Sequence, residues 1–384
     1  MKKVWDKWTR IALVKRILVG LILGAVLGIA VPQATGIAIL GDVFVSALKA
    51  IAPLLVFFLV ISSLCNAGKS HGGVIKTVII LYMFSTVLAA VIAVFASMAF
   101  PVKMTLANAA TDTSAPQGIV EVLNNLLLNV VANPVSSLVN ANYVGILMWA
   151  VLLGLAFRVA DKMTKKVLAD VADGISMVVT WIINLAPFGI FGLVFNTVST
   201  NGLDIFTTYG KLLILLVGCM LFIYFVTNPL LVYWCIRQNP YPLIFQCLKR
   251  SALTAFFTRS SAANIPVNMK VCEEMGLDRD TYSVTIPLGA TINMDGAAIT
   301  ITVMTMATAF TLGIHVDIPT AIILSLLAAL SACGASGVAG GSLLLIPMAC
   351  SLFGISDDIS MQVVAVGFII GVVQDSVETA LNSS

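Results

Sequence analysis

The sequence predicts an all-α membrane protein, and two observations lead to this prediction. Hydrophobic residues make up 59% of the 384 residues and charged residues only 10%, whereas an ordinary soluble domain carries roughly 25% charged residues. Apolar runs long enough to cross a bilayer as helices, which takes ~20 residues, recur along the whole chain. A water-soluble fold is therefore excluded, and the net charge of +3 gives no indication of a nucleic-acid partner.

The first 240 residues predict successive membrane crossings. We interpret the first apolar run as a retained helix, because it is about as long as a membrane span, ~20 residues, and lacks a small-x-small cleavage site. The fourth region holds two apolar pieces separated by Asn133-Pro134 and Asn140-Ala141-Asn142, which predicts one broken crossing. The expected spans are 11–31, 43–65, 74–100, 119–158, 172–199 and 208–236.

Basic residues predict how these spans are oriented. Lysines and arginines crowd the first 16 residues, and Trp5 and Trp8 suit the level of the lipid headgroups. Simple alternation of the spans then brings the basic groups at 69–76, 158–166 and 237–250 to the same side as this terminus. The N-terminus is therefore expected in the cytoplasm.

After residue 240 the apolar runs become short and irregular. Leu243 to Phe257 ends in the polar segment 258–264, and Ile318 to Leu330 runs into the small-residue segment 331–342. Both patterns predict a helix, a polar tip and a second helix. A non-helical tip at membrane depth persists only where protein encloses it or where it faces a watery cavity. Two such tips therefore predict a shared cavity.

Each predicted hairpin is followed by a helix that carries polar residues. The first of these helices, 282–312, is interrupted by the run 293–296, and the second, 360–384, contains Asp375 and Glu378. A hairpin followed by a helix, occurring twice and entered from opposite sides of the membrane, is typical of an inverted-topology repeat.

Charged side chains in these segments are candidates for function. A charge inside a membrane bundle costs at least ~2.5 kcal/mol on insertion scales. The break at 293–296 frees backbone carbonyls that suit Na⁺, and helix starts at the hairpin tips present N–H groups that suit a carboxylate. The sequence thus predicts a site for an ion and a zwitterion. The charged candidates are Arg259, Asp295, Asp375 and Glu378.

Several residues also have a purely structural interpretation. Arg259 is either a loop arginine beneath the cytoplasmic surface or an ion-pair partner of Asp375 within the cavity. Asp295 caps the half-helix that follows it, binds sodium, or does both. The seven scattered cysteines lack a CxxC pair and are interpreted as packing residues. Three polar side chains share a helix face at i, i+3 and i+4, which fits ordinary packing as well as a sodium site: Tyr82, Ser85 and Thr86.

Over essentially its whole length the chain resembles the dicarboxylate/amino acid:cation symporters, which have the glutamate-transporter fold. The most specific elements are Arg259-Ser260-Ser261, Asn293-Met294-Asp295-Gly296, Gly334 to Gly341, and Asp375 with Asn382. The resemblance implies eight transmembrane helices plus two re-entrant helical hairpins with inverted repeats, no enzymatic activity, and a homotrimer surrounded by lipid in the bacterial inner membrane.

The resemblance also implies a division into a fixed scaffold and a moving transport domain. The scaffold would comprise helices one and two in 1–73 and helices four and five in 101–205. The transport domain would comprise helix three in 74–100 and, in 206–384, helix six, both hairpins and helices seven and eight. Such carriers work by an elevator type of alternating access.

Carried over position by position, the resemblance implies a substrate site and sodium sites, with no organic cofactor. Ser261 and Asn382 would hold the substrate α-carboxylate, Asp375 its α-ammonium, and the backbone 337–341 would act as a gate, with Arg259 as a supporting ion-pair partner. The substrate-binding positions are Ser260, Ser261, Gly337, Val338, Gly340, Gly341, Asp375, Glu378, Thr379 and Asn382. The Na⁺-binding positions are Tyr82, Ser85, Thr86, Gly289, Thr291, Asn293, Asp295, Ala332, Ala335 and Asn382.

Two positions depart from the carriers of glutamate and aspartate. Glu378 stands where they have an arginine, and Ala297 stands where they have a threonine. A carboxylate repels an acidic side chain at low dielectric, whereas a hydroxyl can donate a hydrogen bond to it. We therefore expect sodium-coupled import of L-serine and L-threonine. The alternatives are symport of other small neutral amino acids and, less favoured, an ion channel with similar re-entrant loops.

Overall fold

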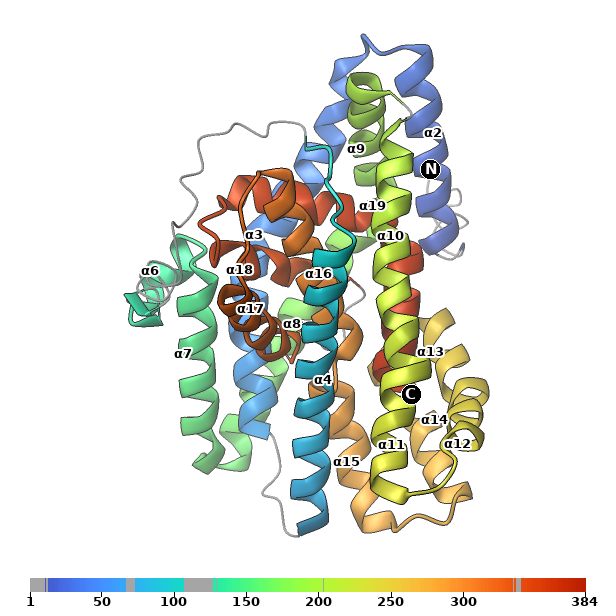
Figure 1. The fold of residues 1–384 in the computed structure, drawn as a ribbon. Helices are drawn as coiled ribbons and strands as arrows, with labels where there is room; N and C mark the ends of the chain where they lie inside the picture. The colour runs from blue at the N-terminus through green and yellow to red at the C-terminus, as the bar shows by residue number, and fades with distance from the viewer. Residues whose placement is uncertain are drawn as a thin grey trace.

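The computed structural model describes residues 11, 13–66, 73–106, 127–128, 130–202, 204–333, 335 and 340–384. Within these ranges all regular secondary structure is helical and no strand occurs (Figure 1). The prediction of an all-α protein is confirmed. Six of the described helical stretches are long and apolar enough to cross a membrane: Thr35–Asn66, Lys76–Ala99, Lys162–Asn184, Phe206–Ile236, Thr281–Thr311 and Asp357–Ser383.

The first half of the chain forms helices close to the expected positions. They are α2 (Leu13–Ala30), η1 (Thr35–Ile37), α3 (Ala38–Asn66), α4 (Gly73–Ala99), α6 (Pro134–Val139), α7 (Tyr143–Ala156), η2 (Phe157–Val159), α8 (Lys162–Asn184) and α9 (Ala186–Asn201). The side chain of Asn133 accepts backbone N–H groups at the start of α6, and Asn142 does the same for α7. The break expected within 119–158 therefore contains two helix starts, and an asparagine side chain caps each of them.

The expected span 172–199 differs from the structure. Helix α8 begins earlier, at Lys162, where the Asp161 carboxylate accepts a hydrogen bond from the Thr164 N–H at 2.8 Å. It ends at Asn184, and α9 then starts with Pro187 in its first turn. Proline has no N–H and disfavours the helical conformation of the residue before it, so the two apolar segments form separate helices.

The second half contains both long and short helices, and several of them are interrupted. They are α10 (Asp204–Phe222), the π-helix η3 (Ile223–Thr227), α11 (Asn228–Ile236), α12 (Tyr241–Cys247), the π-helix η4 (Leu248–Ala252), α13 (Leu253–Thr258), α14 (Ser261–Glu274), α15 (Arg279–Ile292), α16 (Asp295–Thr311), α17 (Ile318–Ala332), η5 (Gly341–Leu345), α18 (Ile346–Ser351) and α19 (Asp357–Ser383). Helix breaks fall at 259–260 and 293–294, within the expected segments 258–264 and 293–296. Both breaks are shorter than expected, because α14 already begins at Ser261 and α16 at Asp295.

The helices pack in two groups. Helix α3 contacts α7, α8 and α9, and α2 lies along α9 (Figure 1). That contact is close, because a Cβ at Gly24 would lie 2.6 Å from the carbonyl oxygen of Phe191. In the second group α16 contacts α4, α17 and α19, and α19 also contacts α10 and α13. The groups meet where α19 contacts α3 and α9, and where α18 contacts α7.

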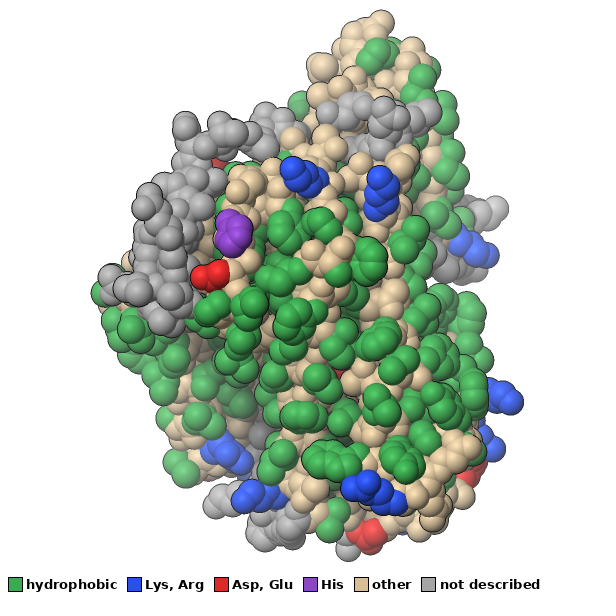
Figure 2. Space-filling view, viewed as in Figure 1, with side chains coloured by type: hydrophobic (Ala, Val, Ile, Leu, Met, Phe, Trp, Pro, Cys, Tyr) green, Lys and Arg blue, Asp and Glu red, His purple; other side chains and the backbone are tan. Residues whose placement is uncertain are grey.

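The surface suits a lipid environment. On the face in Figure 2, hydrophobic side chains cover the middle of the molecule, and lysines and arginines lie toward its upper and lower margins. The centre of the second group is different, because α16 is buried continuously from Asp295 to Ala309. A polar side chain on α16 therefore faces protein, where it needs a partner.

Candidate functional site

The helix breaks converge on α19. Helices α13 and α14 both contact α19, so the break between them at Arg259 and Ser260 lies beside it. Helices α15 and α16 also contact α19 on either side of Asn293 and Met294. The start of η5 contacts both α16 and α19. The structure thus brings together the segments in which the sequence predicts a site.

The Asp295 carboxylate lies against α4. Its Oδ1 accepts hydrogen bonds from Ser85 Oγ and Thr86 Oγ1, each at 3.0 Å, and Ser85 Oγ also lies 3.0 Å from Asn293 Oδ1. Met294, not Asp295, is the residue before α16, and no side-chain cap is formed there. The interpretation of Asp295 as a helix cap is wrong. Ser85 and Thr86 on α4 contribute hydrogen bonds as well as packing.

This cluster has more oxygen acceptors than protons. Ser85 Oγ is within hydrogen-bond distance of the Tyr82 carbonyl, Asn293 Oδ1 and Asp295 Oδ1, and Thr86 Oγ1 is within reach of the same carbonyl and carboxylate. Each hydroxyl has a single proton, so these contacts cannot all be hydrogen bonds at once. A surplus of carboxylate, carbonyl and hydroxyl oxygens is the ligand set that a hard cation prefers.

Two further predicted sodium positions, Tyr82 and Gly289, adjoin this cluster. The Tyr82 hydroxyl donates to the Thr285 carbonyl at 3.3 Å, and a Cβ at Gly289 would lie 2.9 Å from that hydroxyl oxygen. The glycine therefore permits α15 to approach α4 closely. Thr291 Oγ1 donates to the Leu288 carbonyl at 2.7 Å within its own helix.

Arg259 pairs with Asp375 in the interior. Arg259 Nε lies 3.1 Å from Asp375 Oδ2, with the side chains 11% and 6% exposed. The distance makes this an ion pair, although Oδ2 lacks an aligned hydrogen bond from the described residues. Oδ1 accepts the Gly340 N–H at 3.1 Å. Of the two interpretations of Arg259, the cavity ion pair is confirmed.

Glu378 has three hydrogen-bond donors on a single oxygen. Its Oε2 accepts from Thr300 Oγ1 at 2.7 Å, from Ser342 Oγ at 2.8 Å and from Gln374 Nε2. Gln374 lies one helical turn before Glu378, a spacing that could have indicated it as a partner. Thr300 on α16 and Ser342 on η5 gave no such signal, because only the fold brings them to α19.

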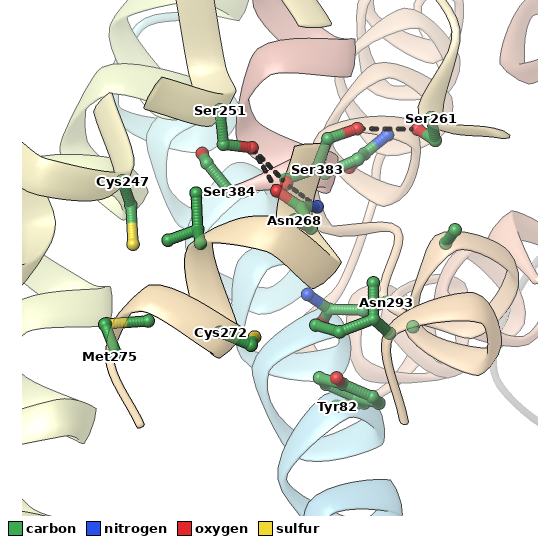
Figure 3. A pocket seen from close by; sticks show the side chains of 15 residues that line it. Tyr82, Cys247, Ser251, Ser261, Asn268, Cys272, Met275, Asn293, Ser383 and Ser384 are labelled. Carbon is green, nitrogen blue, oxygen red and sulfur yellow. Dashed lines mark hydrogen bonds between the residues drawn. The ribbon is translucent and has the colours of Figure 1, made fainter. Parts of the chain in front are cut away.

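Asn382 and Ser261 lie near one cavity at the end of α19. Asn382 Oδ1 accepts the Gly296 N–H at 2.7 Å, and the Ser383 hydroxyl donates to Ser261 Oγ at 2.9 Å. Ser260 caps α14 through a hydrogen bond from the Ala263 N–H. The cavity has a volume of about 170 Å³ (Figure 3). Its lining includes Tyr82, Ser251, Ser261, Asn268, Gly289, Asn293, Asn382 and Ser383.

Two polar residues near this cavity were not anticipated. Ser251 Oγ accepts from Asn264 Nδ2 at 2.8 Å and donates to the Ser383 carbonyl at 2.8 Å, and Asn268 Nδ2 donates to the same carbonyl at 2.6 Å (Figure 3). These contacts join η4 and α14 to the end of α19. Ser251 lies before the predicted tip, so its position in the sequence alone gave no reason to select it.

Four of the remaining predicted positions lie at the second tip: Ala332, Ala335, Gly340 and Gly341. The Ala335 N–H donates to the Ala332 carbonyl at 2.9 Å, and a Cβ at Gly341 would lie 2.7 Å from the Ala335 carbonyl oxygen. Gly340 has a φ of 72°, which favours glycine. Thr379 is buried on α19. Two predicted positions lie outside the described residues: Gly337 and Val338.

The comparisons with known proteins agree with this arrangement. Residues 13–384 match the model of the sodium:dicarboxylate symporter family. Over 385 aligned residues the chain is 58% identical to a protein of Bifidobacterium adolescentis named serine/threonine transporter SstT, covering 100% of this chain and 90% of that protein. A protein of the same name from Streptococcus thermophilus is 55% identical, with 100% and 96% covered. The chain therefore belongs to the sodium:dicarboxylate symporter family and is a multi-pass membrane transporter.

Proposed function

We propose that this protein imports L-serine and L-threonine together with Na⁺ across the bacterial inner membrane. The observation that carries the proposal is the charge of the buried site: Asp295, Asp375 and Glu378 face a single guanidinium, that of Arg259, among the charged groups described there. Buried charge of one sign is costly unless it is compensated. A sodium ion supplies net positive charge, and the ammonium group of a zwitterionic amino acid supplies a local cationic partner for a carboxylate.

Sodium binds at the cluster around Asp295. Ser85 Oγ lies within hydrogen-bond distance of Asn293 Oδ1 and Asp295 Oδ1, and Thr86 Oγ1 lies within hydrogen-bond distance of Asp295 Oδ1. A helix break of this kind can supply backbone carbonyls as further ligands. An ion there would replace shared hydrogen bonds by ion–oxygen contacts, so Ser85 and Thr86 would turn their protons away. The other sodium positions are formed by Gly289, Thr291, Ala332 and Ala335.

The amino acid binds between the first break, the second tip and α19. Asp375 holds the ammonium group of the substrate and Arg259 is the ion-pair partner of Asp375. Ser261 and Asn382 hold the substrate carboxylate. The second tip closes over it, because the Gly340 N–H already reaches Asp375. The side chain of the substrate points to Glu378, where a hydroxyl donates and an acidic group is repelled.

The two packing groups support a division into a fixed scaffold and a moving transport domain. The group of α2, α3, α7, α8 and α9 forms the scaffold, and the group around α16 and α19 moves with the bound cargo as an elevator. Together the two groups comprise eight membrane-spanning helices and two re-entrant hairpins in this proposal. The protein assembles as a homotrimer, and its N-termini lie in the cytoplasm. During transport, the contacts of α19 with α3 and α9 would then break and be replaced by other contacts between the two groups.

Uptake into proteoliposomes tests the proposal. Radiolabelled serine should accumulate only with an inward Na⁺ gradient, and equal uptake without the gradient would refute coupling. Asp295→Asn should raise the Na⁺ concentration for half-maximal uptake at least ~10-fold, because a unit charge near the ion is worth a few kcal/mol at an effective dielectric of ~20. The matched control is Asp161→Asn, which retains a capping side chain outside the site. Currents independent of amino acid would instead indicate a channel.

A further inference from the structure

The surroundings of Glu378 contain a directional set of hydrogen bonds. Gln374 Nε2 donates to Thr300 Oγ1 at 2.7 Å and also to Glu378 Oε2. Because the Thr300 oxygen already accepts from Gln374, its own proton is directed to Glu378 Oε2, at 2.7 Å. An amide nitrogen cannot accept a hydrogen bond. Both groups therefore act on Glu378 only as donors.

This set leaves one carboxylate oxygen for another partner. Ser342 Oγ donates to Oε2 as well, so that oxygen receives three donors from three segments of the chain. A carboxylate has about four lone-pair positions on its two oxygens. A further donor therefore finds its place on Oε1.

The position of Glu378 itself is tightly defined. A Cβ at Gly296 would lie 2.9 Å from the Cα and from the carbonyl oxygen of Glu378, so α16 and α19 approach closely here. Gln374 and Thr300 are both fully buried. Gln374 Oε1 is buried without a partner among the described residues. Rotation of the carboxylate or of its donors would leave further buried polar groups unpaired, which is costly.

We propose that Gln374 and Thr300 are positioning residues that set the preference of this transporter for a hydroxyl-bearing side chain over a methyl group. They hold Glu378 as a fixed acceptor, with Oε1 directed to the substrate. Serine and threonine donate to Oε1, whereas alanine leaves this desolvated oxygen unpaired. The inference rests on the proposed function, since it assumes that the substrate side chain meets Glu378. It adds residues that do not touch the substrate.

Equilibrium binding of serine and alanine to the purified protein in saturating NaCl tests this inference. Thr300→Val removes the hydroxyl at nearly constant shape and should weaken serine binding ~10-fold while alanine binding changes less than ~2-fold, since only serine uses the oriented oxygen. Thr300→Ser retains the donor and should restore the wild-type ratio. Gln374→Leu should act in the same direction as Thr300→Val.

Matched controls separate positioning from packing. Thr302 lies on the same buried helix as Thr300, and Thr302→Val removes a hydroxyl that has no partner among the described residues. Gln362→Leu removes an amide elsewhere on α19. Both should keep the wild-type serine-to-alanine ratio. Equal weakening of serine and alanine by Thr300→Val, or a wild-type protein that binds serine no better than alanine, would overturn the inference. Selective serine binding without sodium-driven uptake would instead refute the proposed function alone.

Discussion

Replacing Arg259 by alanine would leave the Asp375 carboxylate buried with only the Gly340 N–H as a described partner. Removing one partner of a buried ion pair typically costs ~3–5 kcal/mol, because the other charge is left uncompensated. Arg259 also has a φ of 51°, a conformation that costs a non-glycine residue ~1–2 kcal/mol. Arg259→Gly should therefore be more stable than Arg259→Ala by about 1 kcal/mol.

Thermal unfolding of the purified protein measures these differences. Arg259→Ala should lower Tm by on the order of 10 °C. Asp375→Asn removes the unpaired charge, so the double variant should recover most of this loss while it still fails to bind serine. A double-mutant cycle gives the coupling energy directly. If Arg259→Ala destabilises the Asp375→Asn protein as much as it does the wild type, the ion pair does not explain the effect.

Three further predictions concern neighbouring contacts. Lys49→Ala removes Nζ contacts of 3.0 and 2.7 Å to Asp357 and Asp358, which join α3 to α19. Exposed pairs contribute ~0.2–1 kcal/mol each, so loss of both should shift an elevator equilibrium by ~2- to 30-fold toward the other state; unchanged spin-label distances between α3 and α19 would contradict this. Gly296→Ala should cost ~1–3 kcal/mol through its clash with Glu378, measured by unfolding against Gly174→Ala, whose Cβ meets open space. Glu378→Arg should weaken serine uptake and admit acidic amino acids, and unchanged selectivity would exclude Glu378 from the substrate site.

Membrane location, helical class and the positions of the helix breaks could be predicted from the sequence because they depend on local composition. Apolar length predicts a span, and polar or small residues within an apolar run predict where a helix stops. The run 293–296 and the segment after Phe257 follow this rule. The boundary at Leu185 was missed, since Asn184 and Pro187 are isolated residues within an otherwise apolar stretch that is long enough for one span.

Only the tertiary structure decided which polar groups meet. Ser85 and Asp295 are separated by 210 residues and Thr300 and Glu378 by 78, and no spacing along the chain predicts such pairs. The tertiary structure also shows that Arg259 pairs with Asp375 in the interior and that the Asp295 carboxylate contacts α4. The physical reason is that a buried polar group must find partners wherever the packed helices bring them, and helix packing brings together residues that are far apart in the chain.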